Sequence, residues 1–590
     1  MAALCVQLAV LIGFSRSPDF LPRGDDMQFY SDWGRRIAAG QWTDGRAFYG
    51  LPGYAYLLGM VYRGVGFDPF TVGLVQAGLF ACVAVLLHAL AEKMFAPSGA
   101  ARAVGWCAAA GWICFVPAQT FAAVLMPTVW LVAAYWGLVL WLVRARPGPS
   151  VWRWGGIGLG VGCVSMMIAT ITLLSPLILL RILQTVRHSD NGRPAWLRIL
   201  AAAGLYLSGM FAGSAPASLH NYLVAREPVL LSAHSGINFW IGNNPEANGY
   251  PRIPAGLRAT QEGLLQDSIR VAEREAGRPL TRAEVSAHWN AKAQTYIRAH
   301  FGEWCRLLLR KIANFWNGYT YDDICCIKRF QDLGITFAGI GYGQVAALAL
   351  AGAGFALRAN PGAWWAAGAV LLHMAALLPV FVTERYRLAA VPGLLLFAAW
   401  WAVTLVVHLR GRQWKNAALL AGASVCTGWF VSIPRPDPAL WSLDFYKAGI
   451  RQIDSGETGQ AARNLNTALR YAPGSPEIHF ALGNLALKTG NRAAAEAFYG
   501  TTLRIQSFHS RAQNNLGVLA LENRDWVRAE NCFLATLAVE PEDAKAFYLL
   551  ALAREGAGKF AEARESLAVA LKLRPDLAEF RKLEDRLRDR

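Results

Sequence analysis

Long uncharged runs fill the first two-thirds of the chain and constrain its fold more than any other feature. Of the 590 residues, 54% are hydrophobic and only 16% are charged, which is typical of a membrane protein with several spans. The apolar runs are Met1–Phe14, Pro69–Leu90, Ala103–Val116, Phe121–Val143, Ile157–Leu183, Leu197–Ala215, Ile335–Leu357, Trp364–Val382, Leu388–Val407 and Ala417–Val431. Because about 20 apolar residues span a bilayer and the longest run has room for two short helices, we expect about eleven crossings. The sequence therefore predicts an all-α fold, with a polytopic transmembrane helical bundle over residues 1–433.

Basic residues in the short loops predict how this bundle is oriented. Lys and Arg accumulate in cytoplasmic loops of membrane proteins, and here they fall in alternate loops. The residues concerned are Lys93, Arg102, Arg144, Arg146, Arg153, Arg181, Arg187, Arg193, Arg198, Arg358, Arg410, Arg412 and Lys415. We therefore expect residues 15–68, 217–334, 383–387 and all that follow Pro434 to lie outside the cytoplasm. The basic residues of the cytoplasmic loops then explain the net charge of +17, and we expect no nucleic-acid partner.

After residue 433 the composition turns polar and rich in alanine, and small residues recur every 34 positions. The repeated positions hold Gly449, Gly483, Gly517 and Ala551 in one series, Ala461, Ala495, Ala529 and Ala563 in another, and Pro473, Pro541 and Pro575 in a third. This pattern resembles the tetratricopeptide repeat, in which two helices cross at small residues and successive pairs stack into an α-solenoid.

The resemblance implies a linker at 434–441 and a repeat domain at 442–590, with four repeats and a capping helix over Ala578–Asp589. Repeat solenoids of this kind expose an extended concave face. We therefore expect the domain to bind a protein partner or acceptor. A rigid spacer is the alternative.

Three stretches of the first domain carry a second resemblance. The first joins Asp26 and Tyr30 to the segment FYGLPGYAYLL at 48–58, the second is NFWIGNNPEANG at 238–249, and the third is ERYRLAAVP at 384–392. In their order and predicted sidedness they resemble the GT-C class of membrane glycosyltransferases, such as protein mannosyltransferases and lipid A aminoarabinose transferases. The resemblance covers the whole membrane domain. It implies transfer of a sugar from a polyprenyl-phosphate donor to a lipid, glycan or protein acceptor, at the extracytoplasmic face of the bacterial inner (cytoplasmic) membrane.

Asp26 matches the catalytic aspartate of that class by position. An inverting displacement needs a carboxylate that takes the proton of the acceptor hydroxyl, and Asp25, Tyr30 and Asp32 are near enough in sequence to support it. The alternative is that Asp25 and Asp26 cap the helix that follows them, since aspartate is a preferred capping residue. A capping role for Asp25 is compatible with both interpretations.

Basic residues at the expected outer edge of the membrane are candidates for binding phosphate. Arg385 and Arg387 enter a late span, where a guanidinium can hold the donor phosphate by two parallel hydrogen bonds. Interfacial anchoring beside Tyr386 is the alternative. The segment Lys311–Trp316 predicts a basic amphipathic face that attracts anionic lipid.

An asparagine-rich stretch in the long outer segment is a candidate sugar or acceptor contact. Trp240, Asn243, Asn244 and Asn248 offer the flat ring and the amides that hold a sugar. Asparagine, proline and glycine also form turns, and turn formation is a sufficient explanation for the asparagines.

Departures from the family pattern leave other functions open. Met27 stands where close relatives have an acidic residue, so no cofactor is certain and dependence on a divalent metal stays open. A disulfide among Cys305, Cys325 and Cys326 also stays open. The alternatives to a transferase are a non-catalytic membrane scaffold for envelope polysaccharide assembly and an oligosaccharide ligase or polymerase.

Overall fold

The structure is a computed structural model that describes all residues except 18–19, 23–24, 97–98, 146–149, 187–193, 255–256, 258–260, 325–326, 435–437 and 589–590. The chain divides into two units, Met1–Ile433 and Pro434–Arg590. Helices dominate the described residues. The β-pairing found among these residues is an isolated parallel bridge between Phe115 and Ile340. The all-α prediction is confirmed.

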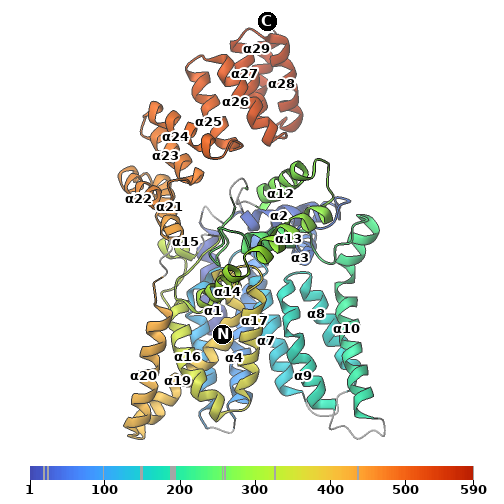
Figure 1. Ribbon diagram of the computed structural model, residues 1–590, viewed down its shortest axis with the longest axis vertical. Coiled ribbons are helices and arrows are strands. Elements are labelled where there is room, and N and C mark those ends of the chain that lie inside the picture. The colour runs from blue at the N-terminus through green and yellow to red at the C-terminus, as the bar shows by residue number, and fades with distance from the viewer. Residues whose placement is uncertain are drawn as a thin grey trace. The chain divides into compact units, whose positions relative to one another are not determined.

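A bundle of apolar helices forms the body of the first unit. Its helices are α1 (Ala2–Ser15), α4 (Pro69–Met94), α5 (Ala101–Ile113), α7 (Thr128–Arg144), α8 (Trp152–Ser165), α9 (Ser175–Val186), α10 (Ala195–Leu219), α16 (Tyr342–Ala359), α17 (Ala363–Leu377), α19 (Val391–Arg410) and α20 (Trp414–Val431). Many of them run side by side along the unit (Figure 1). Buried aromatic residues inside the bundle donate to backbone carbonyls, as Trp136 Nε1 does to Ala389 O at 2.8 Å. Such bonds satisfy a polar group that the core would otherwise isolate.

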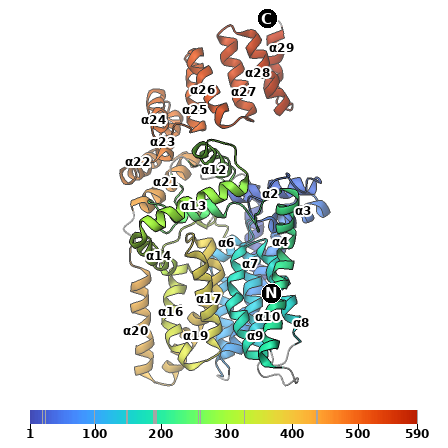
Figure 2. The same ribbon diagram turned by 45° about the vertical axis from the view of Figure 1, so that its right-hand side comes forward.

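Further helices, most of them polar, gather at one end of this bundle. They include α2 (Asp25–Ala38), α3 (Pro52–Val65), α12 (Gln261–Ala276), α13 (Arg282–Ala299) and α14 (Phe301–Trp316), as the turned view shows (Figure 2). Shorter elements of the unit are α6 (Val116–Phe121), α11 (Ser235–Gly242), α15 (Ile327–Asp332), α18 (Glu384–Arg387), the 3-10 turns η1 (Ala169–Leu174) and η3 (Leu388–Ala390), and the π-turn η2 (His220–Val224).

Hydrogen bonds tie the two long segments that were expected outside the membrane. The backbone N–H of Ala233 donates to Phe48 O at 2.8 Å, and Arg282 Nη2 donates to Asp44 Oδ2 at 2.9 Å. Residues 25–65 and 233–316 therefore meet at the same end of the bundle.

The prediction of about eleven membrane spans is wrong. In the part of the chain that the structure describes, four helical segments are long and apolar enough to cross a membrane. They are Pro69–Met94, Ala169–Val186, Ala195–Val224 and Glu384–Arg410. Hydropathy along a sequence does not report where a helix breaks. The run 121–143 is interrupted between α6 and α7, and the run 157–183 is interrupted ahead of η1, which leaves α8 with 14 residues.

Helices α8 and α10 meet along glycines. A Cβ added at Gly158 would lie 2.0 Å from Tyr206 O, and one at Gly162 would lie 2.1 Å from Met210 O. A Cβ at Gly213 would meet the backbone of α8 in the same way, 2.2 Å from Leu159 O. The two backbones are therefore in direct contact, which is the packing that small residues at four-residue spacing allow between membrane helices.

The effect of a glycine-to-alanine substitution in α8 on stability should depend on whether the glycine faces α10. Gly162→Ala is expected to destabilise the first unit by about 1–3 kcal/mol, because its methyl group would collide with the backbone of α10. Gly160→Ala is the matched control, since a Cβ there meets nothing within 4 Å. We expect it to be neutral or stabilising by up to about 1 kcal/mol. Thermal unfolding of the purified variants in one detergent measures both, and equal melting temperatures would contradict the glycine contact.

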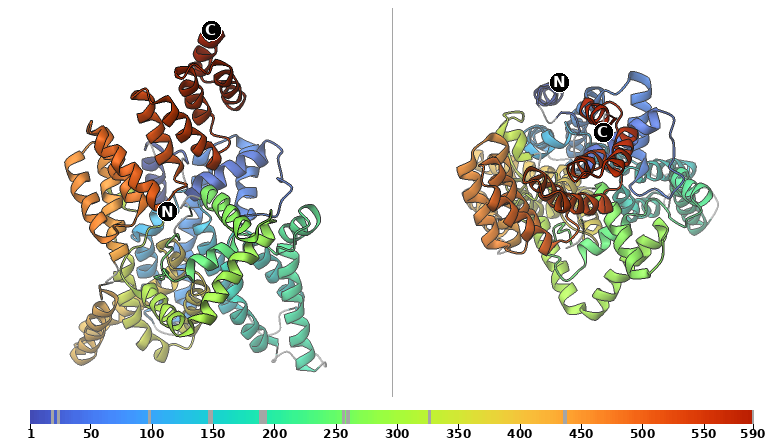
Figure 3. Two further views of the ribbon diagram at one scale, coloured as in Figure 1. Left: turned by 45° about the horizontal axis from the view of Figure 1, so that its top comes forward. Right: turned by 90° about the horizontal axis from the view of Figure 1, so that it is seen from above.

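The second unit consists of paired helices that follow one another in an array (Figure 3). They are α21 (Pro438–Ser455), α22 (Thr458–Tyr471), α23 (Pro476–Lys488), α24 (Arg492–Ile505), α25 (Ser510–Glu522), α26 (Trp526–Val539), α27 (Ala544–Gly556), α28 (Phe560–Leu573) and α29 (Ala578–Arg588). The periodic glycines lie where paired helices cross. A Cβ at Gly483 would lie 2.5 Å from the ring of Tyr499, and one at Gly517 would lie 2.6 Å from that of Phe533. Helix α29 buries Phe580, so that it closes the last repeat.

Candidate functional site

Three charged side chains from distant parts of the first unit meet at the polar end of the bundle. Arg385 donates from Nη1 to Asp26 Oδ2 at 2.5 Å and from Nη2 to Asp323 Oδ2 at 2.8 Å. The three side chains are only 9%, 14% and 13% exposed, in the order Arg385, Asp26 and Asp323. We call Asp26, Asp323 and Arg385 the acid–arginine cluster. Its two carboxylates outnumber its one guanidinium, so with both ionised it carries a net negative charge.

The backbone around α18 holds Arg385 in this position. Thr383 caps α18, since its side chain accepts the N–H of Tyr386 at 3.2 Å. The N–H of Glu384 donates to Tyr321 O, and the N–H of Val382 donates to Gly249 O, each at 2.9 Å. The start of α18 and the residues just before it are thus bonded to the loop that carries Asp323 and to the asparagine-rich stretch.

Arg387 has a different environment from Arg385. It is 1% exposed, and it donates from Nη1 to Asn317 O at 2.6 Å and from Nη2 to Tyr319 O at 2.9 Å. It also bonds carbonyls of the last turn of α14 and pairs with the buried carboxylate of Glu384. Arg387 therefore caps the C-terminal end of α14. To contact a phosphate it would have to give up these bonds, so the two arginines that the sequence grouped together separate into different roles.

The residues predicted to support Asp26 differ in their position relative to the acid–arginine cluster. Tyr30 is next to the cluster on α2, where burial and then the negative charge of Asp26 raise the pKa of its hydroxyl. That hydroxyl therefore remains protonated. Asp32 lies about half-exposed and pairs with Arg35 at 3.6 Å, a partner outside the cluster. The side chain of Asp25 lies outside the described residues.

The asparagine-rich stretch uses its amides within the fold. Asn243, Asn244 and Asn248 are buried, and each bonds backbone atoms. The bonds include Asn243 Nδ2 to Pro379 O at 2.6 Å, Glu246 N to Asn244 Oδ1 at 2.8 Å and Tyr250 N to Asn248 Oδ1 at 3.0 Å. Trp240 packs its ring against Trp289, with centroids 6.2 Å apart. Turn formation accounts for Asn244 and Asn248, whereas Asn243 joins separate segments of the fold. Contact of this stretch with a sugar stays a prediction.

Lys311 does not belong to the exposed basic face that the sequence indicated on α14. It is buried, and its Nζ donates to Leu378 O at 2.8 Å and to Asn243 Oδ1 at 3.2 Å. Burial lowers the pKa of its amine to about 7. Arg306 and Arg310 remain exposed on the same helix.

Lys311 should make the stability of the first unit depend on pH. An unfolded lysine binds its proton below a pH of about 10.4, whereas the folded amine, with its lowered pKa, does so only below about 7. Between these values the unfolded chain holds the extra proton, so the free energy of unfolding rises with pH. Lys311→Met is expected to flatten that rise, and the exposed Lys415→Met is the control. Melting temperatures at pH 6, 7.5 and 9 measure the slope, and an unchanged slope in Lys311→Met would contradict the assignment.

Sequence reasoning missed Asp323. The signal for it is weak, namely two adjacent aspartates, Asp322 and Asp323, in an expected outer segment. Asp322 has a local role, since its Oδ2 accepts the N–H of Ile327 at 2.7 Å. Within the described residues, no group of three or more His, Cys, Asp or Glu side chains could hold a metal ion. Cys325 and Cys326 lie outside the described residues, so the disulfide stays open.

Family models of known proteins match the second unit. Models of the tetratricopeptide repeat family match residues 452–517 and 514–578, which confirms the repeat prediction. Similar solved structures include MamA from Desulfovibrio magneticus RS-1, at 24% identity over 24% of this chain and 78% of that one, with a TM-score of 0.23. YrrB, described as a tetratricopeptide repeat protein with an unusual peptide-binding site, matches at 16% identity over 31% of this chain and 90% of its own, with a TM-score of 0.23. No curated protein matches the chain.

Proposed function

We propose that the chain is a membrane glycosyltransferase of the GT-C class that moves a sugar from a polyprenyl-phosphate donor to a lipid, glycan or protein acceptor. The acid–arginine cluster is the observation that carries this proposal. It brings the predicted catalytic Asp26 to the predicted phosphate-binding Arg385, although the two lie 359 positions apart in the chain. The repeats would bind a protein partner or acceptor.

A membrane location is supported by the four apolar helical segments and by apolar side chains that the first unit exposes. Large apolar side chains project from the first unit, including Leu200, Leu207 and Phe211 on α10 and Val425 and Trp429 on α20. Exposed apolar surface on this scale marks contact with lipid or a partner. It supports a multi-pass protein of the bacterial inner membrane, and the basic loops favour a cluster that faces outward.

In the proposed reaction, Asp26 accepts the proton of the acceptor hydroxyl while the resulting oxygen nucleophile bonds to the anomeric carbon. The bond from that carbon to the donor phosphate breaks, and the polyprenyl phosphate leaves with its electron pair. Arg385 steadies the phosphate, because a guanidinium forms strong charge-assisted hydrogen bonds to phosphate oxygens. Its buried Nε has no acceptor within the described residues, so one donor of the guanidinium is not used within the fold. The second carboxylate, Asp323, would keep Arg385 charged and positioned as its bond to Asp26 loosens.

A transfer assay tests this proposal. The full chain in liposomes is mixed with labelled polyprenyl-phosphate sugars and with membrane extracts as acceptor source, and wild type is compared with Asp26→Asn. Loss of transfer in the variant is expected, and unchanged transfer would rule out Asp26 as the base. A chelator arm, followed by Mg²⁺ or Mn²⁺, measures whether transfer needs a divalent metal.

The non-catalytic scaffold remains the second candidate, and one observation favours it. The cluster pairs its charges internally, which is also what a structural ion-pair network looks like. The two functions separate in cells. If deletion of the repeats abolishes the function of the protein in cells while Asp26→Asn has no effect, the scaffold is correct. A ligase or polymerase would instead consume a lipid-linked glycan in the same assay.

A further inference from the structure

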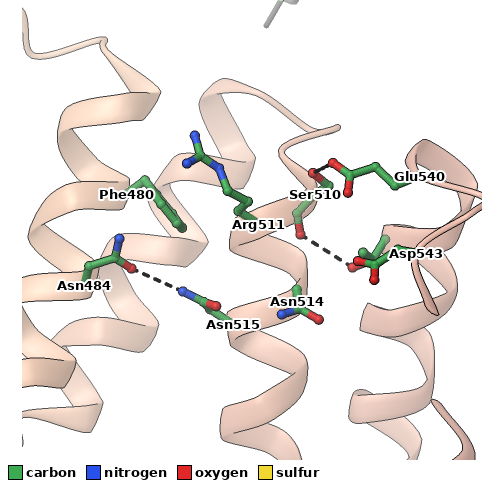
Figure 4. A pocket seen from close by; sticks show the side chains of 9 residues that line it. Phe480, Asn484, Ser510, Arg511, Asn514, Asn515, Glu540 and Asp543 are labelled. Carbon is green, nitrogen blue, oxygen red and sulfur yellow. Dashed lines mark hydrogen bonds between the residues drawn. The ribbon is translucent and has the colours of Figure 1, made fainter. Parts of the chain in front are cut away.

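The second unit contains a polar cavity of about 310 Å³ on one side of its middle repeats (Figure 4). Its walls come from α23, α25 and α26 and from the segment between α26 and α27. Nothing in the transfer mechanism uses these residues. The volume is at the lower end of the range for ligand sites, enough for a few residues of a peptide.

Two asparagines in this cavity have a fixed orientation. Asn484 Oδ1 accepts from the Tyr499 hydroxyl at 2.7 Å and from Asn515 Nδ2 at 3.2 Å, and that Nδ2 also donates to the Tyr499 hydroxyl at 3.0 Å. Both N–H groups of Asn515 are thereby used, as is the oxygen of Asn484. What remains is the amide N–H of Asn484 and the oxygen of Asn515, a neutral donor and acceptor side by side. A peptide group presents the complementary acceptor and donor.

A third asparagine lacks a partner. Asn514 lines the cavity, and its Oδ1 is buried without any donor within the described residues. An unpaired buried acceptor is unfavourable, so a side-chain rotation toward an incoming N–H would be favourable.

The charges of the cavity are separated across it. Arg511 is exposed, and its guanidinium lies over the ring of Phe480 with the Cζ atom 5.0 Å from the centroid. Glu540 and Asp543 lie on the opposite wall, where the Ser510 hydroxyl donates to Glu540 Oε1 at 2.5 Å (Figure 4). Stacking holds the cation in place, and the bond to Ser510 holds one of the anions.

We propose that this cavity binds an extended segment of a partner protein that carries one acidic and one basic side chain a few residues apart. The acidic side chain pairs with Arg511, the basic one faces Glu540 and Asp543, and the asparagines bond the main chain between them. A nucleic acid or an anionic lipid fits poorly, because two carboxylates lie opposite the single arginine. The inference deepens the proposal that the repeats bind a protein, and it is independent of sugar transfer.

Biotinylated nonapeptide mixtures test the site on the full chain in nanodiscs, with binding followed by biolayer interferometry. One mixture carries Glu and Lys two to four residues apart in both orders, and the other three replace Glu, Lys or both by Gln. Wild type is expected to bind the doubly charged mixture roughly tenfold more tightly than the neutral one. Arg511→Gln should weaken binding of the mixtures that contain Glu by about three- to tenfold, and Glu540→Gln should do so for those that contain Lys.

Controls separate the site from the rest of the unit. Arg504→Gln, an exposed arginine of α24 outside the cavity, should bind like wild type. N-methylation of the residue between the two charges should weaken binding, because it removes a main-chain donor. Equal binding of all four mixtures, or no effect of Arg511→Gln, overturns this cavity while leaving the repeats a peptide-binding surface. Failure to bind any mixture overturns both the cavity and the partner proposed for the repeats.

Discussion

Arg387→Met is expected to destabilise the first unit by about 3–5 kcal/mol, the largest stability effect that we predict. Arg387 is enclosed, and it joins the carboxylate of Glu384 to backbone carbonyls at the end of α14. Methionine would fill part of the space without replacing any of these bonds. Glu384, itself 1% exposed, would be left as a buried charge without its partner. Thermal unfolding of the purified chain in a fixed detergent measures the loss.

Two further variants serve as a control and as a test of the ion pair. Arg410→Met removes an exposed arginine from the end of α19 and should leave the melting temperature unchanged within error. Glu384→Gln combined with Arg387→Met removes both charges and should recover part of the loss, because no buried ion then lacks a partner. A melting temperature for Arg387→Met equal to that of wild type would show that Arg387 does not cap α14.

The largest effect on activity is expected from Asp26→Asn, a loss of about 10²- to 10⁴-fold in transfer rate. Asparagine keeps the shape of the side chain and one acceptor oxygen, but it cannot take the proton of the acceptor hydroxyl. Initial rates with a labelled polyprenyl-phosphate sugar, at saturating donor, measure the chemical step.

The structure supplies a matched control in Asp323→Asn. Asp26 and Asp323 pair with the same arginine, are almost equally buried and differ in their place in the chain. Either substitution leaves Arg385 with one carboxylate, so similar effects on stability are expected. The transfer rate should fall by less than about tenfold for Asp323→Asn. A larger loss in Asp323→Asn than in Asp26→Asn would move the base to Asp323.

The sequence was most informative where structure is local and periodic. The small residues at 449, 483 and 517 recur every 34 positions because each lies against one side chain of its own repeat, so the pattern is visible without the fold. Membrane spans were harder to predict from the sequence, because an apolar run such as 157–183 does not show that the helix breaks ahead of η1.

The candidate site was predictable only in part. The family resemblance pointed to Asp26 and Arg385, but their contact and the role of Asp323 depend on chain segments that pack from far apart. Arg387 looked equivalent to Arg385 because both enter the same span. Its role follows from carbonyls about 70 residues earlier in the chain, on α14 and just after it. Lys311 looked exposed for a similar reason, since the carbonyl of Leu378 that it bonds lies on another segment.

The separation between Asp26 and Arg385 also has a consequence for biogenesis. At typical synthesis rates of 5–20 residues per second, the 359 positions between them correspond to roughly 20–70 s during which Asp26 exists without its arginine. The cluster therefore cannot guide the early insertion of the chain. It closes only when the segment 384–410 arrives, so a nascent chain truncated before that point would carry every helix up to α17 and still lack the site.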